Sequence, residues 1–397
     1  MEIFKRIYLI IFTFVLFIVG CSEENQRIPI TKNSLAPGVV SNILIEPLPG
    51  AVKLTYDLPN DQNLAYVKAE CMINGILREV KASTYKNNLT IDGFADSTTY
   101  IVNLYSVSQS EVSSKPVKIE VTPLKPPFQT VFKSISMDRD WGGAYVAFNN
   151  PTEANLAISI IYIDSTGYWN SGITNYTKKK SGTFSIRGFD TEETTFGVYL
   201  SDRWGNMTDT IVKKLVPMFE KQLDRSNYKA IRLPGDVKDA WGWVLPNLWN
   251  GNSGEPGFHT DVDGVWPQYF TIDLGIEGGA KLSRFKIWQR SGSMYAYNDR
   301  NIRKFEIWGS ANPTSDGIFD ESWIHLLTEE IEKPSGLPMG QQTDEDNQNI
   351  ADGHEFNFPI DIPEDIRYIR IKVTETWAKI HCFYVTEVAF YGTDVKE

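Results

Sequence analysis

Cysteine, histidine and positive charge are all scarce in this chain of 397 residues. It has 3 cysteines and 4 histidines, and 50 acidic residues against 39 basic ones leave a net charge of −11. No CxxC pair is present to indicate zinc. With so little positive charge there is no basic stripe along which a phosphate backbone could lie. We therefore expect no nucleic-acid partner, and a neutral ligand instead.

Catalytic motifs are missing as well. The sequence contains no HExxH or similar metal-ligand spacing, no GxSxG elbow, no P-loop and no dinucleotide fingerprint. Glycosidase chemistry needs two carboxylates that face each other across a cleft, and no pattern marks out such a pair. The acidic run at residues 343–347 lies in a polar insertion, residues 334–353, which we expect to be a solvated loop. The sequence therefore predicts a protein that is not an enzyme.

An apolar run stands at the amino terminus. Residues 7–19 follow Lys5 and Arg6 and are too few to span a bilayer comfortably, but they match the hydrophobic region of a signal peptide. The run ends in Ile-Val-Gly-Cys, with the cysteine at Cys21, which resembles the bacterial lipobox. In that motif the cysteine thiol receives a diacylglycerol. The alternative is a plain periplasmic signal peptide with a cysteine there by chance.

The residues after Cys21 favour the lipoprotein reading. The sequence Ser-Glu-Glu-Asn at residues 22–25 resembles the acidic tag that sends lipoproteins of the Bacteroidetes type to the outer face of the outer membrane. We expect a signal peptide at residues 1–20, a lipid anchor on Cys21, a tether at residues 21–34 and an outer-surface location. Cys71 and Cys382 then remain, and we expect both to be small buried apolar side chains rather than a disulfide.

The body of the chain contains an internal repeat. Residues 50–59, followed by Asn-Leu-Ala at 63–65, can be laid over residues 142–151, followed by Asn-Leu-Ala at 155–157. Later in each repeat a Gly-Phe pair precedes an alternating apolar segment. The pattern predicts two tandem modules built of short antiparallel strands.

These two modules resemble fibronectin type III domains. Pro59 and Pro151 stand where a strand must end, because proline cannot donate to a β-ladder. We expect the first domain at residues 35–123 and a second, divergent one at residues 124–217. Their predicted contribution is spacing and orientation.

A third module is predicted at residues 223–397. Its most specific pieces are a strand ending in Thr-Ile-Asp-Leu-Gly at residues 271–275 and a last strand with Glu-x-x-x-Tyr-Gly at residues 387–392. In their order and spacing, its pieces resemble the discoidin family, also called coagulation factor five/eight (F5/8) type C. That resemblance implies a jelly-roll sandwich of the kind shared with galactose-binding modules. The predicted fold class is all-β: two fibronectin type III-like sandwiches followed by a discoidin-like jelly roll.

The resemblance leaves a calcium site open. The family's usual Asp-Gly-Asn loop is represented here by Trp-Asn-Gly-Asn at residues 249–252, with amides in place of the acid. Calcium takes oxygen ligands, and Asn250, Asn252 and Glu387 are the candidates. The alternative role of Glu387 is that of a capping or surface carboxylate.

Aromatic side chains gather in irregular segments of this module. A sugar ring offers a patch of C–H groups, so a flat aromatic beside amides, imidazoles or guanidiniums suits it. The resemblance implies that the ligand-binding loops meet at one end of the sandwich, while the alternative is that most of these aromatics pack in the core. Arg290 and Arg300 flank the tyrosine-rich turn at residues 294–298, and both are expected to hydrogen-bond hydroxyls or an acidic sugar. The predicted ligand-binding residues are Trp249, Asn250, Asn252, His259, Arg290, Tyr295, Tyr297, Asn298, Trp377 and His381.

Other tryptophans are expected to pack. Trp241 and Trp243 stand two apart, so if extended they face the same way and pack against the preceding module. Trp288 and Trp308 are out of phase with their apolar neighbours, which predicts packing between domains. In the second sandwich, both packing and a sugar site stay open for Trp141, Trp169 and Trp204.

The chain as a whole resembles lipoproteins encoded in Bacteroidetes glycan-uptake loci for polysaccharide utilisation. That resemblance implies a cell-surface protein that holds a glycan near outer-membrane uptake proteins. The alternative is a non-catalytic adaptor that binds another outer-membrane protein. The two differ in whether Trp249, Tyr295, Tyr297 and Trp377 form an open aromatic surface or are covered.

Overall fold

The structure is a computed structural model that describes residues 34–262, 264–363 and 365–394. The predicted signal peptide and Cys21 lie outside these residues. Within them, no helix is both long enough and apolar enough to cross a membrane. The chain divides into two compact units. Among the described residues, the first unit holds 34–133, 152–156 and 201–208, and the second holds the others.

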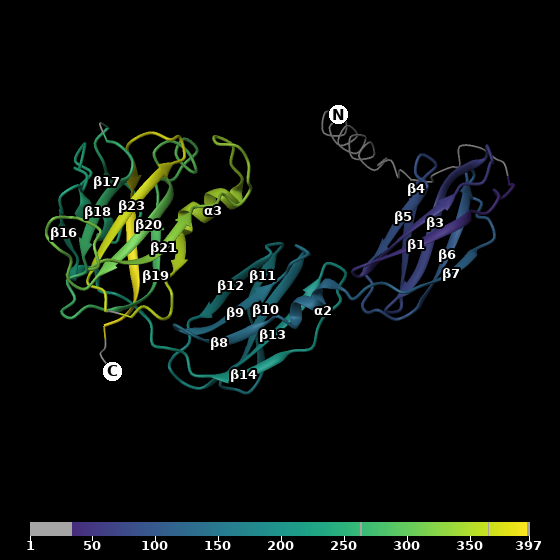
Figure 1. The fold of residues 1–397 in the computed structure, drawn as a ribbon, viewed down its shortest axis with the longest axis horizontal. Helices are drawn as coiled ribbons and strands as arrows, with labels where there is room; N and C mark the ends of the chain where they lie inside the picture. Colours follow the sequence, from purple (N-terminus) through teal and green to yellow (C-terminus); the bar gives the residue numbers. More distant parts are fainter. Residues whose placement is uncertain (1–33, 263, 364, 395–397) are drawn as a thin grey trace, which may run out of the picture. The chain divides into compact units, whose positions relative to one another are not determined.

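The first unit contains a sandwich of two antiparallel sheets (Figure 1). Its inner faces follow the alternating pattern, since Val52, Leu54 and Tyr56 are buried while their neighbours are partly exposed. Cys71 lies in this core as a free thiol, as predicted. One sheet has the order β1 (Ser41–Leu48), β2 (Ala51–Asp57), β5 (Asn88–Asp92), and the other has β4 (Ile76–Ser83), β3 (Leu64–Ile73), β6 (Tyr100–Ser108), β7 (Val117–Val121).

The second unit begins with a sandwich of the same plan. Counted from its first strand, this sandwich has the same strand order in both sheets as the first sandwich. The repeat in the sequence therefore corresponds to a repeated fold. In both sandwiches a Gly-Phe pair meets the glycine before the second strand: Phe94 N donates to Gly50 O at 3.2 Å, and Phe189 N donates to Gly142 O at 2.9 Å. The sheets are β8 (Ser136–Asp140), β9 (Gly143–Asn149), β12 (Ser181–Arg187) and β10 (Leu156–Ile163), β11 (Trp169–Thr177), β13 (Thr194–Asp202), β14 (Ile211–Leu215). Helix α2 (Pro127–Phe132) precedes them.

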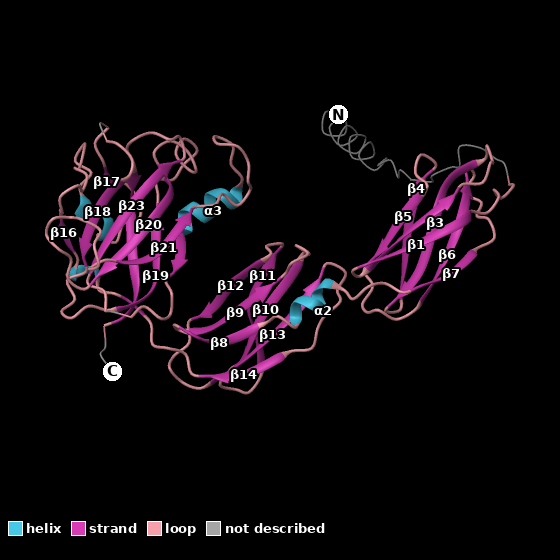
Figure 2. Cartoon of the chain, in the orientation of Figure 1, coloured by secondary structure: helices cyan, strands magenta, loops and turns pink. Residues whose placement is uncertain are grey.

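The carboxy-terminal module packs a four-stranded sheet against a five-stranded one around a single apolar core. Nearly all of its regular structure is strand (Figure 2), so the predicted all-β fold class is confirmed. The first sheet has the order β15 (Lys221–Gln222), β25 (Glu387–Thr393), β19 (Lys281–Trp288), β22 (His354–Asn357). The second has β16 (Lys229–Ile231), β18 (Gln268–Asp273), β23 (Tyr368–Thr376), β20 (Ile302–Ser310), β21 (Ile324–Glu330).

A short pair of strands closes one end of this sandwich. β17 (Phe258–His259) pairs with β24 (Tyr384–Val385), so His259 lies opposite Tyr384 although the two are far apart in the sequence. Two 3-10 helices, η1 (Arg225–Asn227) and η2 (Leu245–Trp249), lie in the preceding connections. The pairing of β17 with β24 therefore brings side chains from distant parts of the sequence together at this end of the module.

The sequence predicts a solvated loop at residues 334–353, and this prediction is wrong. The segment contains helix α3 (Asp344–Asp352), which begins with a capping box between Thr343 and Asp346. Asp346 is fully buried and accepts hydrogen bonds from Ser335 N at 2.9 Å and Ser335 Oγ at 2.7 Å. The acidic run is therefore partly a structural anchor.

The prediction that Trp288 and Trp308 pack between domains is wrong. Trp308 lies against Phe319 and His325 of its own module, with ring centroids 4.9 Å away in each case. Trp288 covers Gly353 after α3, where a Cβ would come within 2.6 Å of the indole nitrogen. Both rings cover their own module.

Candidate functional site

Trp241 stands at the tip of a tight turn at one end of the carboxy-terminal module. Trp243 N donates to Ala240 O at 3.0 Å, and the two central residues, Trp241 and Gly242, have φ angles of +51° and +74°. Positive φ at both positions defines a type I′ turn, which favours glycine and asparagine. The Trp241 side chain nonetheless remains 63% exposed. A bulky aromatic held in strained backbone and in water points to a functional role.

This turn corrects our expectation for Trp241 and Trp243. They are not extended, and their rings lie against residues of their own module rather than the preceding one. Ala240 N donates to His259 O at 2.8 Å and His259 N donates to Trp243 O at 3.1 Å, so the turn is fastened to β17. The rings of Trp241 and Trp243 consequently meet His259, at centroid distances of 4.4 and 6.1 Å.

Further side chains complete this surface, which we call the aromatic shelf. Tyr384 is buried beneath the rings, 5.4 Å from His259 and 6.3 Å from Trp243 between centroids. The half-buried Tyr295 stands 6.1 Å from Tyr384, with its ring at 86° to it. The shelf consists of Trp241, Trp243, His259, Arg290, Tyr295 and Tyr384.

Arg290 is the cationic member of the shelf. Its guanidinium carbon lies 3.6 Å from the Tyr295 ring centroid and 5.3 Å from that of Trp243. Two of its nitrogens also donate to Glu255: Nε bonds Oε1, and Nη2 bonds Oε2 at 3.0 Å. The planar fork of arginine is thus held in place by a stacked ring and a carboxylate.

A buried amide positions the loop behind the shelf. Asn301 is fully buried, and its Nδ2 donates to Tyr295 O at 2.7 Å and to Arg290 O at 2.9 Å. Its Oδ1 accepts from Arg290 N at 3.2 Å. These three bonds fix the backbone on both sides of residues 290–295, so Arg290 and Tyr295 are held against each other.

His259 is the uncharged polar member of the shelf. Burial lowers the pKa of this imidazole below its ordinary value, so the ring is neutral near pH 7. Nδ1 lies 2.7 Å from the carbonyl oxygen of Thr260, which can only accept, so Nδ1 carries the proton. Nε2 is then the hydrogen-bond acceptor of the ring.

The predicted site residues are only partly brought together. The shelf unites His259, Arg290 and Tyr295, but Tyr297 is buried, with its hydroxyl donating to Asn349 Oδ1 at 2.7 Å. Trp377 packs edge-on against Tyr297 at 5.5 Å, and Trp249 packs on the core beside Tyr228 at 6.0 Å. Trp249, Tyr297 and Trp377 are therefore packing residues, and Tyr295 is the one of the four aromatics that lies on the shelf. The covering of the other three counts toward the adaptor alternative.

The predicted polar residues serve mainly to shape loops. Asn250 Oδ1 accepts from Asn252 N at 2.7 Å, and Asn252 Oδ1 accepts from Gly254 N at 3.0 Å. Asn298 Nδ2 donates to Met294 O at 3.1 Å, closing the tyrosine-rich turn. The His381 ring lies 5.9 Å from Trp266, outside the shelf.

Three of the oxygens of the predicted calcium ligands already accept hydrogen bonds, whereas Glu387 Oε2 is buried with no hydrogen-bond partner among the described residues. Glu387 is buried, and its Oε1 accepts from the Arg225 guanidinium and from Gly251 N at 3.1 Å. Arg225 therefore already supplies the positive charge beside this carboxylate, and the oxygens of Asn250 and Asn252 accept from backbone N–H groups of their own loop. Burial raises the pKa of Glu387, although the arginine lowers it. The calcium site therefore stays a prediction.

Sequence reasoning missed four residues of this site: Trp241, Trp243, Glu255 and Tyr384. The Trp-Gly-Trp sequence at residues 241–243 was an available signal, because glycine between two tryptophans permits a tight turn. Tyr384 and Glu255 carried no such signal, since only strand pairing and side-chain packing place them beside Arg290.

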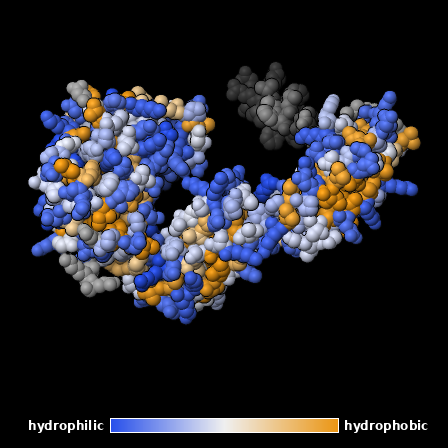
Figure 3. Space-filling model, in the orientation of Figure 1, coloured by the Kyte–Doolittle hydropathy of each residue, from blue (hydrophilic) through white to orange (hydrophobic). Residues whose placement is uncertain are grey.

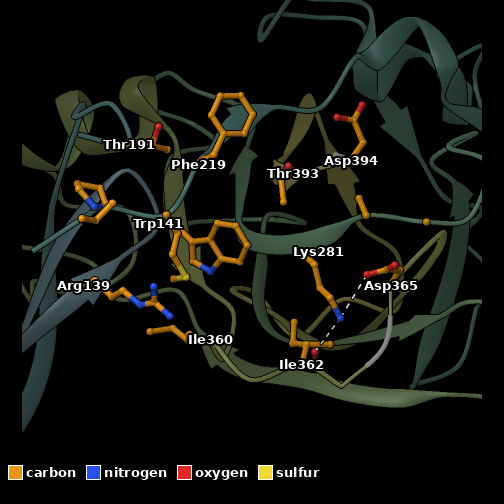
Figure 4. Close-up of a pocket in the computed structure, with 15 residues that line it drawn as sticks. Arg139, Trp141, Thr191, Phe219, Lys281, Ile360, Ile362, Asp365, Thr393 and Asp394 are labelled. Carbon is orange, nitrogen blue, oxygen red and sulfur yellow. Dashed lines mark hydrogen bonds and ion pairs between the residues drawn. The ribbon is translucent and has the colours of Figure 1, made fainter. Parts of the chain in front are cut away.

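A separate hollow of about 880 Å³ lies within the second unit (Figure 4). Trp141 and Phe219 of the second sandwich form apolar walls, and Lys281 and Asp365 of the carboxy-terminal module lie opposite. These two charges are paired with each other at 3.2 Å. We place the candidate site at the shelf because it combines an exposed indole with a neutral imidazole and a guanidinium.

The tryptophans of the second sandwich form no shared surface. Trp141 is buried in the wall of the hollow. Trp204 belongs to the first compact unit and lies between the guanidiniums of Arg78 and Arg203, at 4.4 and 4.6 Å. Trp169 is 45% exposed. The packing alternative therefore holds for Trp141 and Trp204.

Three family models match the chain, each described as a domain of unknown function. They cover residues 37–123 (DUF4959), 124–226 (DUF5126) and 247–392 (DUF5000). No curated protein matches the chain. The discoidin resemblance stays a prediction, because the model matched by the carboxy-terminal module names no such family.

The chain is similar to two solved structures, and sequence identity to one of them shows its family. A two-domain fibronectin type III segment from chicken tenascin is 15% identical, with a TM-score of 0.22, over 45% of this chain and 99% of that one. The SusE-like protein BT2857 is 33% identical, with a TM-score of 0.43, over 68% of this chain and 99% of that one. Because that identity extends over almost the whole of the matched protein, the chain belongs to the family of SusE-like proteins.

Proposed function

We propose that this chain is a cell-surface lipoprotein that captures a glycan through the aromatic shelf of its carboxy-terminal module. Membership of the SusE-like family and the lipobox-like sequence at Cys21 support a place in an outer-membrane glycan-uptake system. The observation that carries the proposal is Trp241: an exposed indole in a strained turn, set against His259 and framed by Arg290. The discoidin-like jelly roll would be the scaffold that presents it.

The shelf offers what a pyranose ring requires. The exposed indole can cover the C–H face of a sugar, while His259 Nε2 can accept from a hydroxyl. Arg290 keeps N–H donors that the fork to Glu255 does not use. A shallow surface of this kind binds each sugar weakly, so many copies on one membrane would supply the avidity.

The role we propose is binding without catalysis. The two carboxylates closest to the shelf residues, Glu255 and Asp299, each pair with a guanidinium: Glu255 with Arg290, and Asp299 with Arg300 at 2.9 Å. Because each is engaged by a guanidinium, the two do not form the pair of free carboxyl groups facing each other that hydrolysis of a glycosidic bond would need. The shelf is therefore better suited to holding a glycan than to cleaving it.

Replacing Trp241 with glycine tests the proposal. Glycine suits the positive φ of the turn, so the W241G protein should fold while losing the exposed ring. We expect binding to soluble neutral oligosaccharides to weaken by about tenfold or more, which corresponds to roughly 1.4 kcal/mol. Isothermal titration calorimetry of the chain from Ser22 to Glu397 would measure the affinity.

The matched control is Trp169→Ala, which removes an exposed tryptophan from the second sandwich. Its affinity should equal that of the unmodified chain. Glycan binding that survives in the W241G protein would move the site away from the shelf. A folded chain that binds no oligosaccharide at all would contradict the proposed function.

An adaptor that binds another outer-membrane protein is the second candidate. Figure 3 shows apolar side chains on the surface of the first sandwich. At the tip of the β3–β4 hairpin, Met72 and Leu77 are cross-strand neighbours, and together with Ile76 each is more than half exposed. If this role holds, Leu77→Lys should abolish co-purification of an outer-membrane protein and leave glycan binding unchanged.

A further inference from the structure

Both guanidinium groups that border the shelf are neutralised by carboxylates. Arg290 bonds the two oxygens of Glu255 through Nε and Nη2, the side-on geometry that binds a carboxylate most firmly. Arg300 Nη1 lies 2.9 and 3.0 Å from the two oxygens of Asp299. A ligand carboxylate would therefore find the fork of Arg290 already occupied.

His259, the other basic residue of the shelf besides Arg290, is uncharged. Burial lowers the pKa of His259, and the nearby charges of Arg300 and Arg290 lower it further. The shelf thus combines exposed aromatic area with hydrogen-bonding groups whose charges cancel or are absent. Such a surface suits hydroxyl groups and offers no net attraction to an anion.

Glu255 and Asp299 differ in how firmly they are held. Asp299 also accepts from the hydroxyl of the buried Tyr384 at 3.2 Å, and its partner Arg300 donates to Cys382 Sγ at 3.1 Å. The Glu255 side chain is 45% exposed, against 23% for Asp299. Glu255 is therefore the outer carboxylate, which an approaching ligand would meet first.

We propose that the shelf selects neutral glycans over uronic acids and that Glu255 is the residue that determines this selectivity. The proposal rests on the glycan-binding function proposed above. A uronate approaching Arg290 must either displace Glu255 from the fork or stand beside it. Two like charges in contact repel each other, and they do so more strongly at a partly buried site than in water. A hydroxyl meets no such repulsion.

Glu255→Gln tests this selectivity directly. Glutamine keeps the size of the side chain and one oxygen for Arg290, but it removes the negative charge. The probes are galacturonate hexamers, their fully methyl-esterified counterparts, and hexamers of glucose, galactose and mannose. Methyl esterification changes the charge of the probe while keeping the sugar and its linkage.

We expect the unmodified chain to bind neutral hexamers and to bind galacturonate at least tenfold more weakly than its methyl ester. The E255Q chain should bind galacturonate at least tenfold more tightly than the unmodified chain does, and added salt should weaken that gain. The readout is the ratio of galacturonate affinity to methyl-ester affinity within each chain, and this ratio should rise at least tenfold in E255Q. Any effect of E255Q on the orientation of Arg290 changes the binding of both probes and cancels in that ratio.

Two controls identify the source of the gain. Glu193→Gln removes an equivalent charge from an exposed ion pair with Lys214 in the second sandwich and should leave galacturonate binding unchanged. Adding Arg290→Gln to Glu255→Gln should remove the gain, because the freed guanidinium is its source.

The outcomes separate this inference from the proposed function. Equal or tighter binding of galacturonate than of its ester by the unmodified chain would overturn the selectivity, even if Trp241→Gly still abolished binding. An E255Q chain that gains no affinity for galacturonate would overturn the role of Glu255. A gain of galacturonate affinity in E255Q supports that role, whichever neutral hexamer the unmodified chain prefers. An unmodified chain that binds none of the neutral hexamers would count against the proposed function.

Discussion

At the scale of single residues, His354 is a titratable group that the core holds in its neutral form. It lies on β22, is buried, and its Nε2 has no hydrogen-bond partner among the described residues. Burial lowers its pKa from 6.5 to about 4. The unfolded chain therefore takes up a proton at a higher pH than the folded chain does.

The stability of the protein should depend on pH through this residue. As pH falls from about 6.5 to about 4, only the unfolded state becomes protonated at His354, so the free energy of unfolding should drop by about 3 kcal/mol. Below pH 4 both states bind the proton and the loss stops. Urea denaturation at several pH values would show the drop, and His354→Leu should remove it. An identical pH profile in both proteins would contradict the assignment.

The residues of the shelf show why the site was only half predicted. His259, Arg290 and Tyr295 were predicted as ligand contacts from their chemistry, and the structure places all three on one surface. Trp249 has the same chemistry but packs on the core, because η2 directs its ring toward Tyr228. Residue type and local sequence do not determine which way a ring in an irregular segment points.

At the scale of elements, α3 depends on a single buried carboxylate. Asp346 accepts from Ser335 N and Oγ and from Thr343 N, the last at 2.9 Å. Although burial raises the pKa of Asp346, these hydrogen bonds lower it below its ordinary value. The carboxylate thus joins the helix start to the preceding loop.

Asp346→Ala should destabilise the protein by about 2–3 kcal/mol, because it leaves three donors without their acceptor in a buried place. Asp344→Ala removes an exposed acid from the same first turn and should cost about 0.5 kcal/mol. Equilibrium denaturation in urea would compare the two variants. Equal costs would mean that α3 does not depend on the buried carboxylate.

The start of α3 could have been predicted from the sequence, but the many acidic residues of this segment led us to predict a loop. Thr343 and Asp346 stand three apart, which is the spacing of a capping box, and Ile350 follows as the buried residue. The density of acids in this segment favoured a solvated loop instead. By contrast, the repeated Gly-Phe pairs of the two sandwiches marked equivalent turns, because backbone bonds to Gly50 and Gly142 impose the same local geometry twice.

At the scale of the molecule, Glu220 links the second sandwich to the carboxy-terminal module inside the second unit. Its side chain accepts from Arg187 Nη1 at 3.2 Å, Ser283 Oγ at 2.5 Å and Arg284 Nε at 3.1 Å. It is only 7% exposed. One carboxylate therefore balances two guanidiniums from the two parts of the unit.

Glu220→Ala should destabilise the second unit by about 3 kcal/mol, since it leaves two largely buried guanidiniums without their shared partner. The second sandwich and the carboxy-terminal module should then unfold in separate steps during differential scanning calorimetry. Glu355→Ala removes a more exposed carboxylate from Arg284 and should cost less than about 1 kcal/mol. A single unshifted transition in the E220A protein would show that other contacts join the two parts.

The sequence by itself determined the strand content, the repeated sandwich and the burial of Cys71 and Cys382. These features depend on alternation, turn residues and apolar character, all of which act between near neighbours in the chain. Only the tertiary structure decided where the aromatic shelf lies. Pairing of β17 with β24 sets His259 against Tyr384, and β19 brings in Arg290. No local pattern encodes such pairings between distant segments, because they form only when the sandwich closes.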